Sequence, residues 1–258
     1  FHHLFNPKPK DALRDLSTDR PDLTESPYTV DAGHVQWEID LLNATYDRTV
    51  NQGESLTNVS RIWGGLNFKL GLLDQVDLQT IVPIHVDQRT KSLTPGQSQR
   101  KKGTGDLTTR LKINLWGNDG GRTAMAIIPF VTFPTGTDQI GQERTTGGVV
   151  LPFAVELKKG WSLGAQTEVD WVEDEGNGLD TQWFNTLTLG HAIVGNLAGY
   201  TECTARMHLD SDQAWEGQWN VGLTYAISSE IQLDGGCNFG ITSSAPDANP
   251  FLGLSMRF

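Results

Sequence analysis

From Val35 to its last residue, the chain is a succession of segments in which apolar side chains alternate with small or polar ones. In residues 76–87, apolar side chains fall at every second position, with Asp77, Gln79 and His85 between them. A period of two is that of a β-strand with one apolar and one polar face. Such a chain folds either as a sandwich of two sheets or as one sheet closed into a barrel.

The alternating segments number twelve, which is an even number, as single-chain bacterial barrels have. The twelve predicted strands span residues 35–46, 57–70, 75–87, 106–116, 122–133, 148–158, 161–172, 180–191, 196–209, 214–227, 230–241 and 250–258. Soluble sandwiches seldom run to twelve strands of this length, so the pattern favours an antiparallel transmembrane β-barrel.

The connections between these strands alternate in length. Those after even-numbered strands are tight, as at 71–74 and 117–121, whereas those after odd-numbered strands are mostly longer, as at 88–105 and 134–147. Bacterial outer-membrane barrels have short periplasmic turns and longer extracellular loops. We therefore expect both termini to be periplasmic.

Composition excludes several other classes of protein. The densest apolar run, residues 124–131, is too short for a transmembrane helix, which needs about 20 apolar residues. A net charge of −11 argues against a nucleic-acid partner. The start Phe1-His2-His3 has no signal-peptide pattern, so we expect the numbering to begin at a processed residue or at the first ordered one.

Aromatic residues gather near the ends of the predicted strands. Trp37 and Trp161 fall near the turn side, whereas Tyr46, Trp171 and Trp183 fall near the loop side. Amphipathic rings favour the two membrane–water interfaces, so two aromatic girdles are predicted.

The last strand ends on an aromatic residue. Leu252, Leu254, Met256 and Phe258 share one face of it. A closed barrel leaves no free edge because its last strand pairs with its first. This ending resembles the C-terminal signal of bacterial outer-membrane β-barrels.

Two further blocks carry a family resemblance. Residues 17–27 read STDRPDLTESP, and residues 129–136 read PFVTFPTG. Together with the terminal Phe258, they resemble the outer-membrane family named after the MetA pathway of phenol degradation, from about Ser17 to the end of the chain. The resemblance implies a barrel and an outer-membrane location. The family name reflects a genetic context and implies no substrate.

Charged residues recur on the polar face of the strands. Facing lipid, Arg or Lys would each cost about 2–4 kcal/mol at the bilayer midplane, so we assign these residues to the lumen. The predicted lumen-lining residues are Glu38, Asp40, Arg61, Lys69, Asp77, His85, Arg110, Lys112, Glu168, Asp170, Glu202 and Arg206. They form either a polar pathway or an interior closed by ion pairs.

Residues 1–33 differ from the barrel residues 34–258, because prolines and clustered charges interrupt regular structure. A twelve-stranded barrel is wider than side chains alone can fill. We therefore predict that this segment plugs the periplasmic mouth through pairing of its own charges with the lumen wall. The plug candidates are Asp19, Arg20, Asp22 and Glu25. Alternatively, the segment lies in the periplasm and contacts a partner.

No catalytic, cofactor or metal site is predicted. The histidines His85, His191 and His208 lie on distant strands without a nucleophile motif. Cys203 and Cys237 fall on the outward faces of strands that are not neighbours, so both should be free and lipid-facing.

The predicted function is passive passage of small solutes through the lumen, with outer-membrane lipid and unidentified solutes as partners. The alternative is a scaffold barrel with a blocked lumen that binds an envelope protein.

Overall fold

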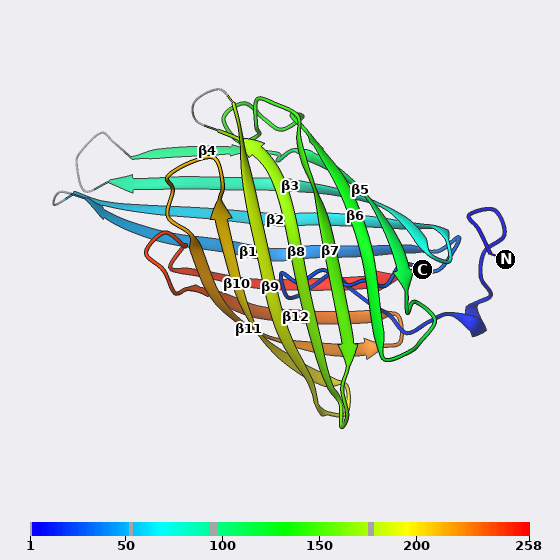
Figure 1. Cartoon of the computed structure of the whole chain (residues 1–258). Coiled ribbons are helices and arrows are strands. Elements are labelled where there is room, and N and C mark those ends of the chain that lie inside the picture. Colours follow the sequence, from blue (N-terminus) through cyan, green and yellow to red (C-terminus); the bar gives the residue numbers. More distant parts are fainter. Residues whose placement is uncertain (1, 52–53, 93–97, 175–177) are drawn as a thin grey trace.

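The computed structural model describes residues 2–51, 54–92, 98–174 and 178–258. In it, the strands form one antiparallel sheet that closes on itself through the pairing of β2 with β3 (Figure 1). In chain order the elements are the 3-10 helix η1 (Lys10–Ala12), β1 (Val35–Asn51), β2 (Glu54–Leu73), β3 (Val76–Ser92), β4 (Gln99–Gly103), β5 (Leu107–Trp116), β6 (Thr123–Phe133), β7 (Thr146–Glu156), β8 (Trp161–Glu173), β9 (Leu179–Val194), β10 (Leu197–His208), β11 (Glu216–Ser228), β12 (Ile231–Gly240) and β13 (Ala248–Arg257). The predicted twelve-stranded barrel is confirmed, with β4 as an additional short strand that pairs only with β3.

The first and last long strands form the seam. Gln36 on β1 pairs with Arg257 on β13, and the Phe258 amide donates to the Val35 carbonyl at 2.8 Å. The rings of Trp37 and Phe258 lie edge to face with centroids 6.0 Å apart. The chain end therefore completes the wall, as the sequence pattern indicates.

The barrel is apolar outside and charged inside. Leu187, Leu223 and Leu252 expose about half of their surface, at 53%, 51% and 49%, whereas Glu38 and Lys112 are buried at 1% and 0%. A soluble protein shows the reverse arrangement. Within the described residues, no helix is long and apolar enough to cross a membrane.

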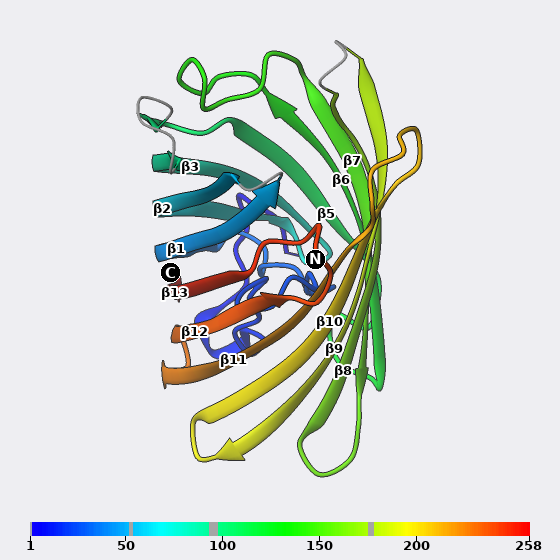
Figure 2. The same ribbon diagram turned by 90° about the vertical axis from the view of Figure 1, so that its left-hand side faces the viewer.

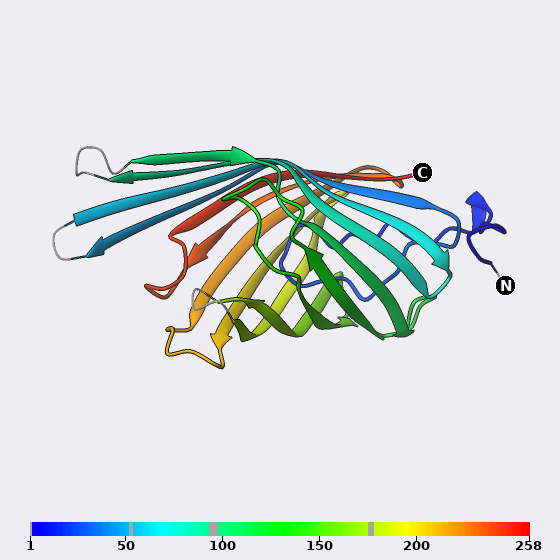
Figure 3. The same ribbon diagram turned by 90° about the horizontal axis from the view of Figure 1, so that it is seen from above.

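Two predicted connections contain additional strand. Between the strands predicted at 35–46 and 57–70, β1 continues to Asn51 and β2 begins at Glu54. Residues 88–105 were expected to form a long connection, but β3 continues to Ser92 and β4 pairs back onto it. These residues are polar on both faces, so they lack the alternation that marks a strand in the sequence. The prolonged β1, β2, β3 and β4 extend beyond the rest of the barrel (Figures 1 and 3). Residues 93–97, together with 52–53 and 175–177 of two other predicted loops, lie outside the described residues.

A shared irregularity reverses the alternation in this extended part. β1 has an extra residue relative to β13 between Asp40 and Leu42, and Gly64 on β2 adopts a φ of +68°. As a result, adjacent residues such as Leu41 and Leu42 are both exposed. β-Bulges have this effect, because one extra residue moves the following side chains to the opposite face.

The bulge corrects two lumen assignments. Leu42 pairs with the lipid-facing Leu252, which places Ala44, two residues on, on the outer face. Arg61 pairs with Ala44 and therefore also faces outward. His85 is exposed and contacts the outward-facing ring of Trp63 at 5.6 Å between centroids. The predictions that Arg61 and His85 line the lumen were wrong, because simple alternation does not register the inserted residue.

Candidate functional site in the barrel lumen

The N-terminal segment, residues 2–33, runs into the barrel, where its part around Asp19 and Thr24 contacts the wall (Figure 2). Its start, including η1, projects beyond the end of the barrel (Figure 1). It begins at the end of the barrel that carries the short turns, where His3 bridges to Leu73, and returns there to enter β1 at Val35. We refer to this end as the turn end and to the opposite end as the loop end. Both chain termini lie at the turn end (Figure 1).

Asp19 is the most heavily paired residue of this segment. Its carboxylate contacts Lys69 of β2 at 2.5 Å, Arg110 of β5 at 3.2 Å, and Lys112 of β5. Side-chain exposure is below 10% for all four residues. Without Asp19, three cations would face one another in a buried space, so this carboxylate neutralises the wall around it.

Glu38 of β1 holds the backbone beside Asp19. Both of its carboxylate oxygens accept the Asp19 amide, each at 3.1 Å, and one also contacts Lys69. The Gln36 side chain donates to Glu38 and to the Ser17 carbonyl, each at 2.8 Å. The wall therefore binds the main chain of the segment as well as its charges.

Arg20 reaches two acidic residues, one on each side of the seam. It contacts Asp40 of β1, and it forms a two-pronged pair with Asp234 of β12, with Nη2–Oδ1 at 2.8 Å and Nε–Oδ2 at 3.2 Å. A Cβ at Gly253 would lie 2.1 Å from Arg20 Nη2, so glycine leaves the room that the guanidinium occupies. Arg20 thus links the N-terminal segment to both sides of the closure.

Glu202 of β10 binds the deepest part of the segment. It accepts the Leu23 amide at 3.1 Å, and the amide and hydroxyl of Thr24 at 2.8 and 2.6 Å. The Thr24 hydroxyl also lies 2.6 Å from that of Thr186 on β9. One wall carboxylate therefore satisfies several donors of the segment.

Glu25 closes the network on the side of β5 and β8. Its carboxylate pairs with Arg110, with Nη2–Oε2 at 2.8 Å, and its amide donates to Gln166 at 2.7 Å. Arg110 also donates to Gln79 at 2.8 Å. Arg110 is therefore shared between two carboxylates of the segment, Asp19 and Glu25.

Asp31 anchors the segment at the turn end. It accepts Lys8 Nζ at 3.0 Å, Arg14 Nε at 2.8 Å and the Arg14 amide at 3.0 Å, and it lies 3.5 Å from Arg257. Burial alone would raise the pKa of Asp31, but the hydrogen bond from Lys8 and the charge of Arg14 hold it below its usual value. On the wall, Asp77 accepts the Val30 amide at 2.9 Å.

The remaining predicted residues lie nearer the loop end or beside Glu202. Asp22 lies close to Glu202 and Thr188. Glu168 accepts Gln166 Nε2 at 2.6 Å. Asp170 lies 3.8 Å from Arg206, whose guanidinium covers the Phe184 ring at 4.4 Å. The structure therefore places ten of the twelve predicted wall residues on the lumen face, with Arg61 and His85 as the exceptions.

Neutral side chains on the lumen face also bind the segment, and the sequence reading missed them. Asn114 donates to the Pro27 carbonyl at 2.9 Å, and Asn118 accepts the Thr29 amide at 3.1 Å. They fall at the same alternate positions as the charged residues or in a tight turn. The alternation places Asn114 on the lumen face, but only charged residues were selected as lumen candidates, so this neutral side chain was not among them.

One cavity borders the N-terminal segment toward the loop end, and another borders it toward the turn end. The loop-end cavity measures about 400 Å³, with Leu23 and Phe184 among its apolar residues and Arg206 and Glu216 among its charged ones. The turn-end cavity measures about 580 Å³ and includes Tyr28. The ion pairs of Asp19 and Glu25 lie between them. This arrangement offers polar binding surface on either side and an obstruction in the middle.

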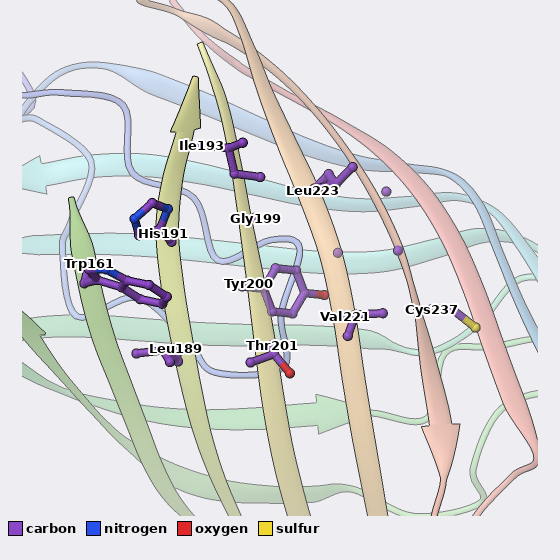
Figure 4. Close-up of a pocket in the computed structure, with 13 residues that line it drawn as sticks. Trp161, Leu189, His191, Ile193, Gly199, Tyr200, Thr201, Val221, Leu223 and Cys237 are labelled. Carbon is purple, nitrogen blue, oxygen red and sulfur yellow. The ribbon is translucent and has the colours of Figure 1, made fainter. Parts of the chain in front are cut away.

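Within the described residues, no cluster of three or more His, Cys, Asp or Glu side chains is arranged to hold a metal ion. The one outer-face hollow drawn in Figure 4 measures about 650 Å³ and is lined mainly by apolar residues of β8–β12, including Leu223 and Cys237. Cys203 and Cys237 are both free, as predicted.

Comparison with solved structures shows the barrel fold. The COG4313 outer membrane channel from Pseudomonas putida F1 has a TM-score of 0.67 at 14% identity, covering 94% of this chain and 100% of that one. The transport unit of the autotransporter AIDA-I from Escherichia coli has a TM-score of 0.58 at 12% identity, covering 87% and 90%. For the NanC porin the values are 0.51 and 10%, covering 84% and 98%.

No curated protein matches the chain significantly. A family model, in contrast, covers almost the whole molecule. The model described as "Putative MetA-pathway of phenol degradation" matches residues 18–258, which include both sequence blocks and the terminal strand. The chain is a member of this family of barrel proteins.

Proposed function

We propose that this protein is an outer-membrane channel for passive passage of small solutes and that residues 1–33 are its resident plug. The observation that carries the proposal is the two-cavity lumen, in which the N-terminal segment is the obstruction between the loop-end and turn-end cavities. A polar lumen with cavities on both sides is the arrangement that a pore needs. Two proteins of similar structure, an outer membrane channel and a porin, agree with this role.

The chemistry of the plug supports reversible closure. Its contacts with the wall are hydrogen bonds and ion pairs, such as those of Asp19 and Arg20, and water can replace these when the segment leaves. An apolar plug would expose hydrophobic surface on departure. We propose that the described arrangement is the closed form of the channel.

Orientation follows from the short turns and long loops. We propose a bacterial outer-membrane location with the turn end, and hence both termini, in the periplasm. We also propose that the protein is not an enzyme. The lumen carboxylates of Asp19 and Glu38 are bound to cations or backbone amides.

The scaffold alternative remains the competing function, because ion pairs across a lumen can also be permanent. A disulfide across the plug contact separates the two. The hydroxyls of Thr24 and Thr186 lie 2.6 Å apart, so cysteines at both positions should be close enough to bond. Cys203 and Cys237 would first be replaced by serine to leave a single pair.

The test is single-channel conductance in a planar bilayer for the Thr24→Cys/Thr186→Cys protein, oxidised and then reduced. We expect few openings when oxidised and openings like those of the cysteine-free parent when reduced. The Thr24→Ser/Thr186→Ser protein is the matched control, and its conductance should not change when reductant is added. Absence of conductance from every folded form, including one lacking residues 1–33, would reject the channel and favour the scaffold.

A further inference from the structure

The part of the sheet that extends beyond the barrel has a strongly cationic outer face. Its side chains can be assigned from three rows of paired residues across the strands. The row nearest the barrel is Ala44, Arg61, Asp87 and Lys102. The next is Tyr46, Val59, Arg89 and Arg100, and the last is Arg48, Thr57 and Lys91. Residues paired across neighbouring strands share a face.

The outward direction of these rows is fixed by the seam. Leu42 pairs with Leu252, which is 49% exposed between buried neighbours and therefore faces lipid. Alternation from Leu42 carries the same face to Ala44, Tyr46 and Arg48. The outer face of the extension thus holds six cations, Arg48, Arg61, Arg89, Lys91, Arg100 and Lys102, against one carboxylate, Asp87. We call these six residues the cationic patch.

The opposite face of the same strands provides a comparison. Its rows contain Lys101 as the cation and Asp47 as the acid, among neutral residues such as Asn58 and Gln88. The chain as a whole carries a net charge of −11. The outer face of the extension is therefore positively charged, although the chain as a whole is negative and the opposite face of the same strands is nearly neutral.

Most side chains of the cationic patch do not form ion pairs within the protein. Arg100 pairs with Asp87, with Nε–Oδ1 at 2.9 Å, and Lys102 lies 4.0 Å from the same carboxylate. Within the described residues, Arg61, Arg89 and Lys91 form no ion pair with a carboxylate closer than 4.0 Å. Arg89 and Lys91 are exposed, so their charges are available to a partner.

Along the barrel axis, the cationic patch lies at the level expected for the membrane surface. Trp63, 37% exposed, and Tyr46, 38% exposed, lie on the same outer face, where such rings mark the lipid–water interface. Arg61 is two residues beyond Trp63, a rise of about 7 Å along a strand. The cations thus begin where acyl chains give way to headgroups.

We propose that the cationic patch binds the phosphates of a phosphorylated glycolipid of the lipid A type in the outer leaflet. Arginine recognises phosphate with paired N–H donors, and lysine contributes point charge. The neighbouring apolar residues of the barrel, such as Leu42 and Ile84, would contact the acyl chains of the same lipid. A soluble phosphate ion would lack that second contact.

The proposal is tested with the full chain in non-ionic detergent containing EDTA, which excludes bridging by divalent cations. Fluorescent bisphosphorylated lipid A is titrated and its anisotropy measured, with dephosphorylated lipid A as the comparison. We expect binding to the phosphorylated lipid to be at least tenfold tighter. Equal affinity for the two lipids would overturn the proposal. So would displacement by inorganic phosphate at an equal phosphate concentration.

Matched variants locate the site. Arg89→Glu/Lys91→Glu should weaken binding at least tenfold, and Arg89→Gln/Lys91→Gln serves if the reversed charges impair folding. Lys102→Glu should weaken binding and Lys101→Glu should not, because these adjacent residues face opposite sides. Equal loss in the last two, or no loss in the Arg89/Lys91 variants, would contradict the patch.

Discussion

Arg20 and Asp234 are 214 positions apart in the chain, yet two parallel hydrogen bonds join them inside the lumen, at 2.8 and 3.2 Å. The planar guanidinium and the carboxylate fix each other in orientation as well as in distance. Asp40, on the first strand, contacts the same guanidinium. One residue of the N-terminal segment thereby joins strands on both sides of the seam.

Replacement of Arg20 by alanine should release the plug. The change leaves Asp234, whose side chain is fully buried, and Asp40 without their cation. Loss of one partner of a buried pair costs roughly 3–5 kcal/mol, so the free energy of unfolding should fall by about this amount. Channel openings in a planar bilayer should become more frequent. Arg122→Ala, on an exposed turn, is the control and should change neither property.

Replacement of Gly71 by alanine should displace the segment where it leaves the lumen. A Cβ there would lie 2.0 Å from the backbone oxygen of Asp31, which no side-chain rotation relieves. We expect a loss of about 1–3 kcal/mol in unfolding free energy. Gly178→Ala adds the same atom in open space and should be neutral. Thermal unfolding of both variants checks the difference, and equal melting temperatures would contradict this contact.

Anchorage at Asp31 should be stable in mild acid and lost in strong acid. Its pKa is lower in the folded protein than in the unfolded chain, where it is about 3.9. Asp31 therefore stabilises the fold above the unfolded value, and this contribution disappears as pH falls through the lower folded value.

Asp31→Asn measures that contribution directly. At pH 7, the free energy of unfolding of the variant should be lower than that of the parent. Each lost charge-assisted hydrogen bond should account for at most roughly 1.5–3 kcal/mol of the difference. The difference between the two melting temperatures should stay constant from pH 7 to about 5 and shrink below about 4. A difference that does not change with pH would show that the charge of Asp31 contributes nothing.

Cys203 should react with thiol reagents that dissolve in lipid. It is exposed, and it pairs across β10 and β11 with Trp219, which is 49% exposed. In liposomes, a membrane-partitioning maleimide should label it and a charged maleimide should not. In the unfolded protein both should react. Preferential labelling by the charged reagent in liposomes would contradict a lipid-facing position.

The positions of the strands, and the face of each strand that points to the lumen, were predictable from the sequence. The reason is that lipid and water impose opposite requirements on alternate residues. The seam residue Phe258 and inward residues such as Lys69 and Glu202 follow that rule. Arg61 and His85 do not, because the alternation reverses at the irregularity that β1 shares with Gly64 on β2, and counting alternate positions does not register it. The β4 strand was missed because neither of its faces is apolar.

The path of the N-terminal segment through the lumen could not be predicted in the same way. Its charges indicated pairing with the wall, but which strand each one meets depends on the closed ring. Arg20 meets Asp234 only because β12 lies next to β13 and β13 next to β1. Much of the remaining attachment uses backbone groups, such as the Asp19 amide on Glu38, and any sequence offers those.

The N-terminal segment enters and leaves the lumen at the same end, with its second end continuous with β1. It can therefore withdraw as a tethered loop, without threading past the loop end. A short tether keeps the detached segment at an effective concentration in the millimolar range. Each departure should then be followed by rapid recapture, so current through the barrel should appear as brief bursts. The duration of a burst should report the re-docking rate of the N-terminal segment, and the interval between bursts should report its off-rate.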